Sequence, residues 1–93
     1  ARQVTRSDGR IEALTTAEAK LLAVFLKNPR IVMSRDELLE LSAGRKAGPF
    51  DRTIDNQVSR LRRKIEADVL RPRIISTVRN GGYCLNSDVE SHA

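Results

Sequence analysis

Apolar residues recur at helical spacing in two segments of the first half of the chain, and each segment follows a helix-start signal. Thr15-Thr16-Ala17-Glu18 is a capping-box pattern, and the apolar positions after it, Ala17, Leu21, Leu22, Phe25 and Leu26, continue until Asn28-Pro29. Ser34-Arg35-Asp36-Glu37 repeats the capping box, with Met33 and Leu38 as a hydrophobic staple. The pattern predicts helix one over about 16–28 and helix two over about 35–42, with Leu38, Leu39 and, as a further candidate, Leu41 buried.

A third helix is predicted over about 52–66, with Asp51 as its N-cap. Its apolar residues lie within about 60° of arc on the helical wheel, which makes a narrow core-facing stripe; they are Ile54, Val58, Leu61 and Ile65. The opposite side carries Arg52, Asn56, Ser59, Arg60 and Arg63, with Thr53, Gln57 and Lys64 on one flank. Asp55, Arg62 and Glu66 lie on the other flank, where Arg62 and Glu66 are expected to form an i,i+4 ion pair.

Two segments show strand and turn signals rather than helical spacing. Residues 3–14 read as a weak hairpin around Ser7-Asp8-Gly9, or as the remnant of a larger sheet. Near the C-terminus, β-rich runs flank Asn80-Gly81, the strongest short-range hairpin signal, and predict a hairpin over about 74–85. Residues 44–49, read as GRKAGP, are expected to form a loop. The result is a single α+β domain over residues 1–93.

The positive charge of the chain is concentrated in one part of it. The net charge is +5, and residues 52–79 alone hold eight basic and three acidic side chains, an excess of the same size. A domain whose excess charge lies on one helix and one hairpin has a candidate polyanion-binding face. The alternative is a solvated surface without a partner.

Several classes of function lack the residues they need. The single cysteine, Cys84, cannot form an internal disulfide, and the single histidine, His92, lies in a polar tail, so we expect no metal, no cofactor and no catalytic site. A nuclease needs a general base and usually a metal, and the carboxylates here are scattered. No apolar run approaches the roughly 20 residues of a membrane helix, and the N-terminus does not resemble a signal peptide, so we expect a cytoplasmic protein without membrane contact. The first residue is not Met, so we expect the chain to be part of a longer protein.

The polar face of the third helix suits DNA. Arginine pairs with guanine or with phosphate, and Asn and Gln pair with adenine. Helix two, a loop, a polar and basic helix three and then a hairpin is the order of a winged helix-turn-helix. Arg79, beside the hairpin tip, could enter a narrow minor groove, or only protect a strand edge. The main rival function is a winged-helix protein-interaction module.

Four segments, LTTAEAKLLAVFLKNP, MSRDELLEL, DRTIDNQVSRLRRKIE and RPRIISTVRNGGYCL, resemble the C-terminal effector domain of OmpR/PhoB-family two-component response regulators. The resemblance covers about residues 14–85. It implies a winged helix with an N-terminal antiparallel sheet, three helices and a C-terminal hairpin wing. It also implies a transcription regulator whose receiver domain, missing from this chain, is phosphorylated by a sensor histidine kinase.

The resemblance also implies roles for individual residues and partners. Base or adjacent phosphate contacts fall to Asn56, Gln57, Arg60 and Arg63, and DNA-backbone contacts to Arg52, Thr53, Arg62 and Thr77. Arg79 becomes the minor-groove contact of the wing, and Asn80 stands at a position where the family usually has glycine. The expected partners are promoter direct repeats bound by head-to-tail pairs, and RNA polymerase through the loop from Gly44 to Phe50.

Overall fold

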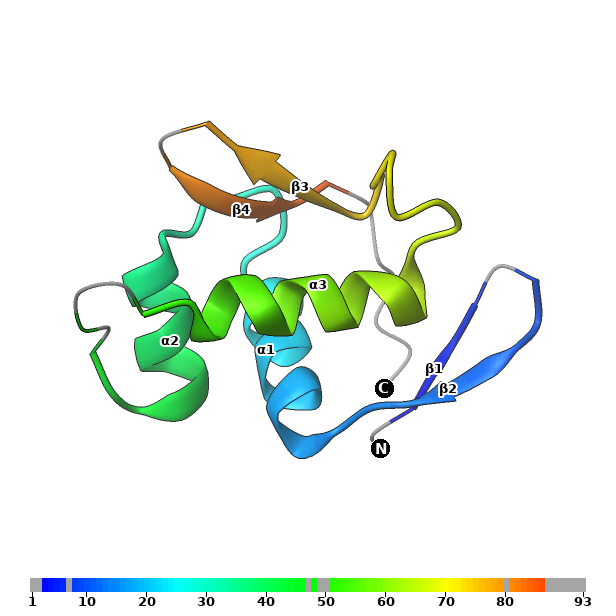
Figure 1. The fold of residues 1–93 in the computed structure, drawn as a ribbon, viewed down its shortest axis with the longest axis horizontal. Coiled ribbons are helices and arrows are strands. Elements are labelled where there is room, and N and C mark those ends of the chain that lie inside the picture. Colours follow the sequence, from blue (N-terminus) through cyan, green and yellow to red (C-terminus); the bar gives the residue numbers. More distant parts are fainter. Residues whose placement is uncertain (1–2, 7, 47, 49–50, 80, 87–93) are drawn as a thin grey trace.

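Three helices lie between two antiparallel hairpins in a computed structural model that describes residues 3–6, 8–46, 48, 51–79 and 81–86 (Figure 1). The elements are β1 Gln3–Thr5, β2 Ile11–Ala13, α1 Thr16–Lys27, α2 Arg35–Ala43, α3 Thr53–Ile65, β3 Ile75–Val78 and β4 Gly82–Leu85. In Figure 1, α3 crosses the middle of the molecule in front of α1, with the β3–β4 hairpin on one side. The order of helices and hairpins is the one that the sequence predicts.

The first two helices begin at the predicted capping boxes. In α1, the hydroxyl of Thr15 accepts from the backbone N–H of Glu18 at 3.2 Å, and Glu18 Oε1 accepts from the N–H of Thr15 at 2.9 Å. Ser34 and Glu37 make the same reciprocal pair at the start of α2, at 3.1 and 3.0 Å. Because these bonds satisfy N–H groups that a helix start leaves unpaired, they fix where α1 and α2 begin.

The third helix begins one residue later than its predicted cap requires. The N-cap is Arg52, whose side chain makes no capping hydrogen bond, so the prediction of Asp51 as N-cap is wrong. Asp51 still acts on the helix start, because its Oδ1 accepts from the N–H of Thr53 at 2.9 Å. A short carboxylate can satisfy the first turn from just outside the helix as well as from the cap position.

The β1–β2 hairpin is two-stranded, with the register Gln3 to Ala13 and Thr5 to Ile11. Gly9 adopts a φ of 89° in its turn, a conformation that glycine reaches without strain. Of the predicted turn residues, Ser7 lies outside the described residues. The structure therefore has the hairpin that was predicted within residues 3–14.

The β3–β4 hairpin pairs Ile75 with Leu85 and Val78 with Gly82, which leaves residues 79–81 as its connection. The predicted tip residue Asn80 lies outside the described residues. Gly82 has a φ of 113°, and a Cβ there would meet the backbone oxygen of Met33 at 2.1 Å. Only glycine allows this approach, which lets Met33 and Tyr83 exchange two backbone hydrogen bonds of 2.8 and 2.9 Å.

The core lies where the three helices meet the β3–β4 hairpin. Its fully buried side chains are Leu21, Phe25, Leu38, Leu39, Val58, Leu61, Ile75 and Leu85. Of the four predicted core positions of α3, Val58 and Leu61 are fully buried, Ile54 is buried and Ile65 is partly buried. Leu41 is 60% exposed, so its prediction as a core candidate is wrong.

Candidate nucleic-acid interface

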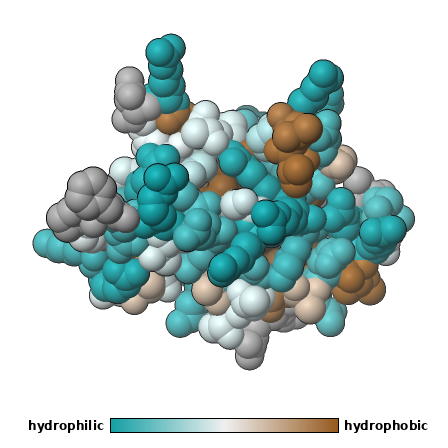
Figure 2. All heavy atoms as spheres, viewed as in Figure 1, coloured by the Kyte–Doolittle hydropathy of each residue, from teal (hydrophilic) through white to brown (hydrophobic). Residues whose placement is uncertain are grey.

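The outward face of α3 is polar and basic, and no other described part of the chain covers it. Asn56, Ser59, Arg60 and Arg63 are exposed, and Gln57 is half-buried. Within the part of the chain that the structure describes, the side chains of Asn56, Arg60 and Arg63 donate no hydrogen bond and form no ion pair. Figure 2 shows that the surface over α3 is mainly hydrophilic. Donor groups are thus exposed along one side of a helix, in the arrangement that base and phosphate contacts require.

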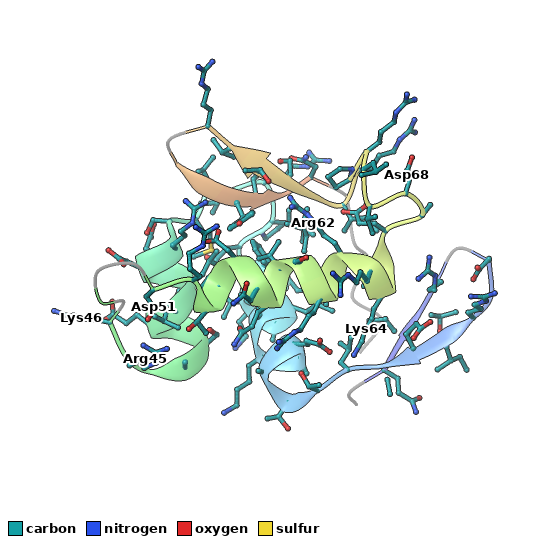
Figure 3. The ribbon with its side chains drawn as sticks, in the orientation of Figure 1. Arg45, Lys46, Asp51, Arg62, Lys64 and Asp68 are labelled. Atoms are coloured by element: carbon teal, nitrogen blue, oxygen red, sulfur yellow. The ribbon has the colours of Figure 1, made fainter. Side chains whose placement is uncertain are left out.

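The start of α3 is held by the loop before it. Arg45 donates to Asp51 Oδ2 at 2.8 Å and to Thr53 Oγ1 at 3.1 Å, and Figure 3 shows Arg45 and Asp51 together beside α2 and the start of α3. Hydrogen bonds from Thr53, and then from Arg45, lower the pKa of the Asp51 carboxyl well below its usual range. Arg52 is exposed beside this cluster, with its Nε 3.7 Å from Asp55 Oδ2. The predicted residues Arg52 and Thr53 therefore stand together, but Thr53 already accepts a bond within the protein.

Arg62 points from α3 toward the β3–β4 hairpin (Figure 3). Its Nε and Nη2 donate to the backbone oxygen of Ile75 at 3.1 and 2.8 Å, and Nη2 also donates to Thr77 Oγ1 at 2.9 Å. Glu66 is engaged elsewhere and forms no ion pair with Arg62 among the described contacts, so the predicted i,i+4 pair is wrong. The flank position of Arg62 on the helical wheel explains this, because that flank faces the hairpin.

Arg79 is exposed at the outer end of β3. Within the described residues its guanidinium has no hydrogen-bond or ion-pair partner. It lies one residue beyond the Val78 and Gly82 pair. The structure therefore places a free positive charge near the end of the hairpin, separate from the α3 face.

Asp55 and Tyr83 form a contact between α3 and the hairpin that the sequence does not reveal. The Tyr83 hydroxyl donates to Asp55 Oδ1, and Arg35 Nε donates to the same oxygen at 2.7 Å. Burial disfavours the charged form of Asp55, but hydrogen bonds from Tyr83 and Arg35 together outweigh this and lower its pKa. Burial, followed by the bond to Asp55, raises the pKa of Tyr83. In the sequence Asp55 is recognisable only as an acidic residue in the first turn of a basic helix, which does not indicate what it contacts.

The opposite flank and the end of α3 are held by the β1–β2 hairpin and by α1. Lys64 Nζ donates to the backbone oxygen of Ala13 at 2.9 Å and to Glu18 Oε1 at 2.5 Å. Arg6 donates to the backbone oxygens of Arg63 and Glu66 at 2.8 and 3.1 Å, which satisfies carbonyls at the helix end. Lys64 therefore serves the fold and not the free basic face, although the sequence placed it among the basic residues of this region.

The comparisons with known proteins decide the family. Residues 9–85 match the family model described as "Transcriptional regulatory protein, C terminal". The chain belongs to this family. It is 42% identical to the regulatory protein VirG of Agrobacterium fabrum over 89 residues, which are 96% of this chain and 35% of VirG. The chain thus spans about a third of the length of the curated relatives it matches.

Solved structures of the family share the fold. The DNA-binding domain of Klebsiella pneumoniae RstA, solved in complex with the RstA box, has a TM-score of 0.79 and 36% identity, over 91% of this chain and 83% of that one. The response regulator DrrB, an OmpR/PhoB homologue of Thermotoga maritima, has a TM-score of 0.73 and 32% identity, over 85% of this chain and 36% of that one. The predicted winged-helix fold and OmpR/PhoB resemblance are confirmed. The chain is therefore a C-terminal effector domain of the response-regulator type.

The described residues contain no group of three or more His, Cys, Asp or Glu side chains arranged to hold a metal ion. None of the described helices has the length and apolarity to cross a membrane. Cys84 is a buried free thiol, and His92 lies outside the described residues.

Proposed function

We propose that this domain binds double-stranded DNA in a sequence-specific manner, with α3 as the recognition helix in the major groove. The observation that carries the proposal is the free polar and basic face of α3, from Asn56 to Arg63, on a domain of this family. A 13-residue helix is about 20 Å long and fits a major groove about 12 Å wide. Asn56, Gln57, Arg60 and Arg63 would contact base edges and neighbouring phosphates.

The wing, which we define as the β3–β4 hairpin with its connection, would supply the second contact. Arg79 would enter the adjacent minor groove, where an A·T-rich sequence narrows the groove and concentrates negative potential. Arg52, Thr53, Arg62 and Thr77 would contact the DNA backbone. For Arg62 this means using the donor groups that its bonds to Ile75 and Thr77 leave free, since a guanidinium has five N–H donors.

Membership of this family also suggests which other molecules the domain works with. The domain would be the output of a longer regulator whose receiver domain accepts a phosphoryl group from a sensor histidine kinase. It would act in the cytoplasm, bind direct repeats as head-to-tail pairs and meet RNA polymerase through the loop from Gly44 to Phe50. It would carry out no catalysis itself.

The rival function, a protein-interaction module, finds less support. Such interfaces are anchored by exposed aromatic residues and arginines in desolvated pockets. Of the described aromatic residues, Phe25 and Tyr83 are both buried. An exposed face of unpaired arginine and amide side chains suits nucleic acid better.

The experiment that tests the proposal compares base preference in variants of the outer face of α3. Arg60→Ala and Asn56→Ala should each change the preferred base at one position of a selected DNA site and weaken binding to it by about 1–3 kcal/mol. Lys27→Ala, an equal loss of charge at the exposed end of α1, is the matched control and should leave the preference unchanged. Equal weakening on every sequence by Arg60→Ala and Lys27→Ala would contradict base readout.

A further inference from the structure

Three elements of the domain meet at the side chain of Asp55. Asp55 lies in the first turn of α3, and its side chain is only 18% exposed. Its Oδ1 accepts hydrogen bonds from Tyr83 of β4 and from Arg35, the first residue of α2. One carboxylate oxygen therefore joins the proposed recognition helix, the helix before it and the wing.

The aromatic ring of Tyr83 is contacted by arginine side chains, in addition to the hydrogen bond of its hydroxyl group. The guanidinium carbons of Arg35 and Arg62 lie 5.3 and 5.4 Å from the ring centroid, within the range of cation–π attraction. The same Arg62 guanidinium donates hydrogen bonds to Ile75 and Thr77, so it also contacts β3, the other strand of the wing. Both strands of the wing are thus attached to α3 through polar contacts with directional geometry.

These contacts lie close to the end of the wing that carries Arg79. Thr77 pairs with Tyr83, and Arg79 follows two residues later, about 7 Å along an extended strand. The minor groove is about 6 Å wide, so a small tilt of the wing displaces an inserted guanidinium from it. The contacts of Tyr83 therefore fix the orientation of the wing, and that orientation determines where the Arg79 guanidinium lies.

The charge of Asp55 supports a positioning role. A carboxylate on a helix that faces DNA repels phosphate, and here its charge is balanced by Arg35 and Arg52. Its three neighbours come from three different places: α2, the N-cap of α3 and the wing. A residue that only kept the surface soluble would not need these partners.

We propose that Asp55 and Tyr83 are positioning residues that fix the wing on α3 and so determine how strongly the domain discriminates the sequence flanking its core site. The inference rests on the proposed minor-groove contact of Arg79. It assigns part of the sequence specificity to two side chains that do not touch a base.

The test is a double-mutant cycle between Tyr83→Phe and Arg79→Ala. Tyr83→Phe removes one hydroxyl and leaves the net charge unchanged, so it isolates the bond to Asp55. Binding is measured on two duplexes that share one selected core site and differ in an A·T-rich or G·C-rich flank. Tyr83→Phe should weaken binding to the A·T-flanked duplex by about three- to tenfold and to the other by less than about twofold, because contacting residues couple by such amounts.

The cycle decides whether Tyr83 acts through the wing. In the Arg79→Ala background, Tyr83→Phe should cause no further loss on the A·T-flanked duplex. Ser76→Ala is the matched control: it removes a hydroxyl from the same hairpin, where Ser76 donates to the backbone oxygen of Cys84 in β4, and should leave the flank preference intact. Thermal unfolding of each variant shows that the folded domain is being compared, and Asp55→Asn enters the same cycle if Tyr83→Phe does not fold.

The outcomes separate this inference from the proposed function. Losses that add in the double variant, or that are equal on both flanks, overturn the positioning role while Arg60→Ala still shows base readout. A wild-type domain without any sequence preference overturns both.

Discussion

Arg62 of α3 donates a 2.9 Å hydrogen bond to Thr77 of β3, which joins two residues that the family resemblance assigns to separate DNA-backbone contacts. The same guanidinium also donates to the backbone oxygen of Ile75 and covers one face of Tyr83. Arg62 and Thr77 therefore form one unit, in which the position of the wing and the availability of donors for phosphate are coupled.

Arg62→Lys should destabilise the domain although it keeps the charge. Lysine has no planar fork to bond Ile75 and Thr77 together, so we expect a loss of about 1–2 kcal/mol in the free energy of unfolding, measured by urea denaturation. Arg60→Lys, on the exposed face of the same helix, is the control and should stay within about 0.5 kcal/mol of wild type. Equal stability of the two variants would show that Arg62 does not connect helix and wing.

Glu66→Ala should be more destabilising. Glu66 is 2% exposed, and its two carboxylate oxygens accept from the backbone N–H groups of Arg73, Ile74 and Ile75 at 2.8 to 3.0 Å. Removing these acceptors leaves buried donors unpaired at the entry to β3, and we expect a loss of about 2–3 kcal/mol in urea denaturation.

Glu40→Ala is the matched control for Glu66→Ala. Glu40 is exposed on α2, and its substitution should change the free energy of unfolding by less than about 0.5 kcal/mol. A similar small change for Glu66→Ala would mean that water can replace the carboxylate at β3.

Alkaline titration should report the bond between Tyr83 and Asp55 directly. The chain has one tyrosine, and burial followed by the bond to Asp55 raises its pKa above the ordinary value of 10.0. The tyrosinate absorbance of the folded domain should therefore rise at a higher pH than in urea. Since the folded state favours the neutral phenol, the stability this contributes is present below pH 10 and is lost as the pH rises through the folded pKa.

Asp55→Asn should lower the folded midpoint of that titration, but not fully to the value in urea, because burial of the ring remains. An unchanged midpoint in Asp55→Asn would show that the carboxylate does not hold the phenol in solution.

DNA affinity should fall steeply with salt. If about five to seven of the basic residues neutralise phosphates, the logarithm of the binding constant should fall against the logarithm of the salt concentration with a slope of roughly −4 to −6. Lys64→Met should leave this slope nearly unchanged, because Lys64 is bound to Ala13 and Glu18, whereas Arg63→Met should reduce it by about one unit. A slope near zero in the wild type would rule out phosphate anchoring.

The parts of the fold that depend on local chemistry could be predicted from the sequence. The capping boxes at Thr15 and Ser34 mark helix starts because their partners lie three residues away. The stripe from Ile54 to Ile65 shows which side of α3 faces the core, and by the same geometry which side stays free.

Contacts between distant residues could not be predicted in this way. The wheel places Arg62 on a flank but does not say that the wing lies there, and Tyr83 is 28 residues from Asp55. The sequence predicts that Glu66 pairs with Arg62. In the structure the chain after Pro72 passes beside Glu66 instead, and three of its backbone N–H groups donate to the carboxylate. Such partners depend on the path of the connection, which no periodicity records.

The most direct test of the central claim is selection of bound duplexes from a random DNA pool by the wild-type domain. We expect enrichment of one core sequence with an A·T-rich flank, recurring as a direct repeat about once per helical turn, roughly every 10 to 11 base pairs. Recovery of no enriched sequence, with binding that follows charge alone, would contradict it.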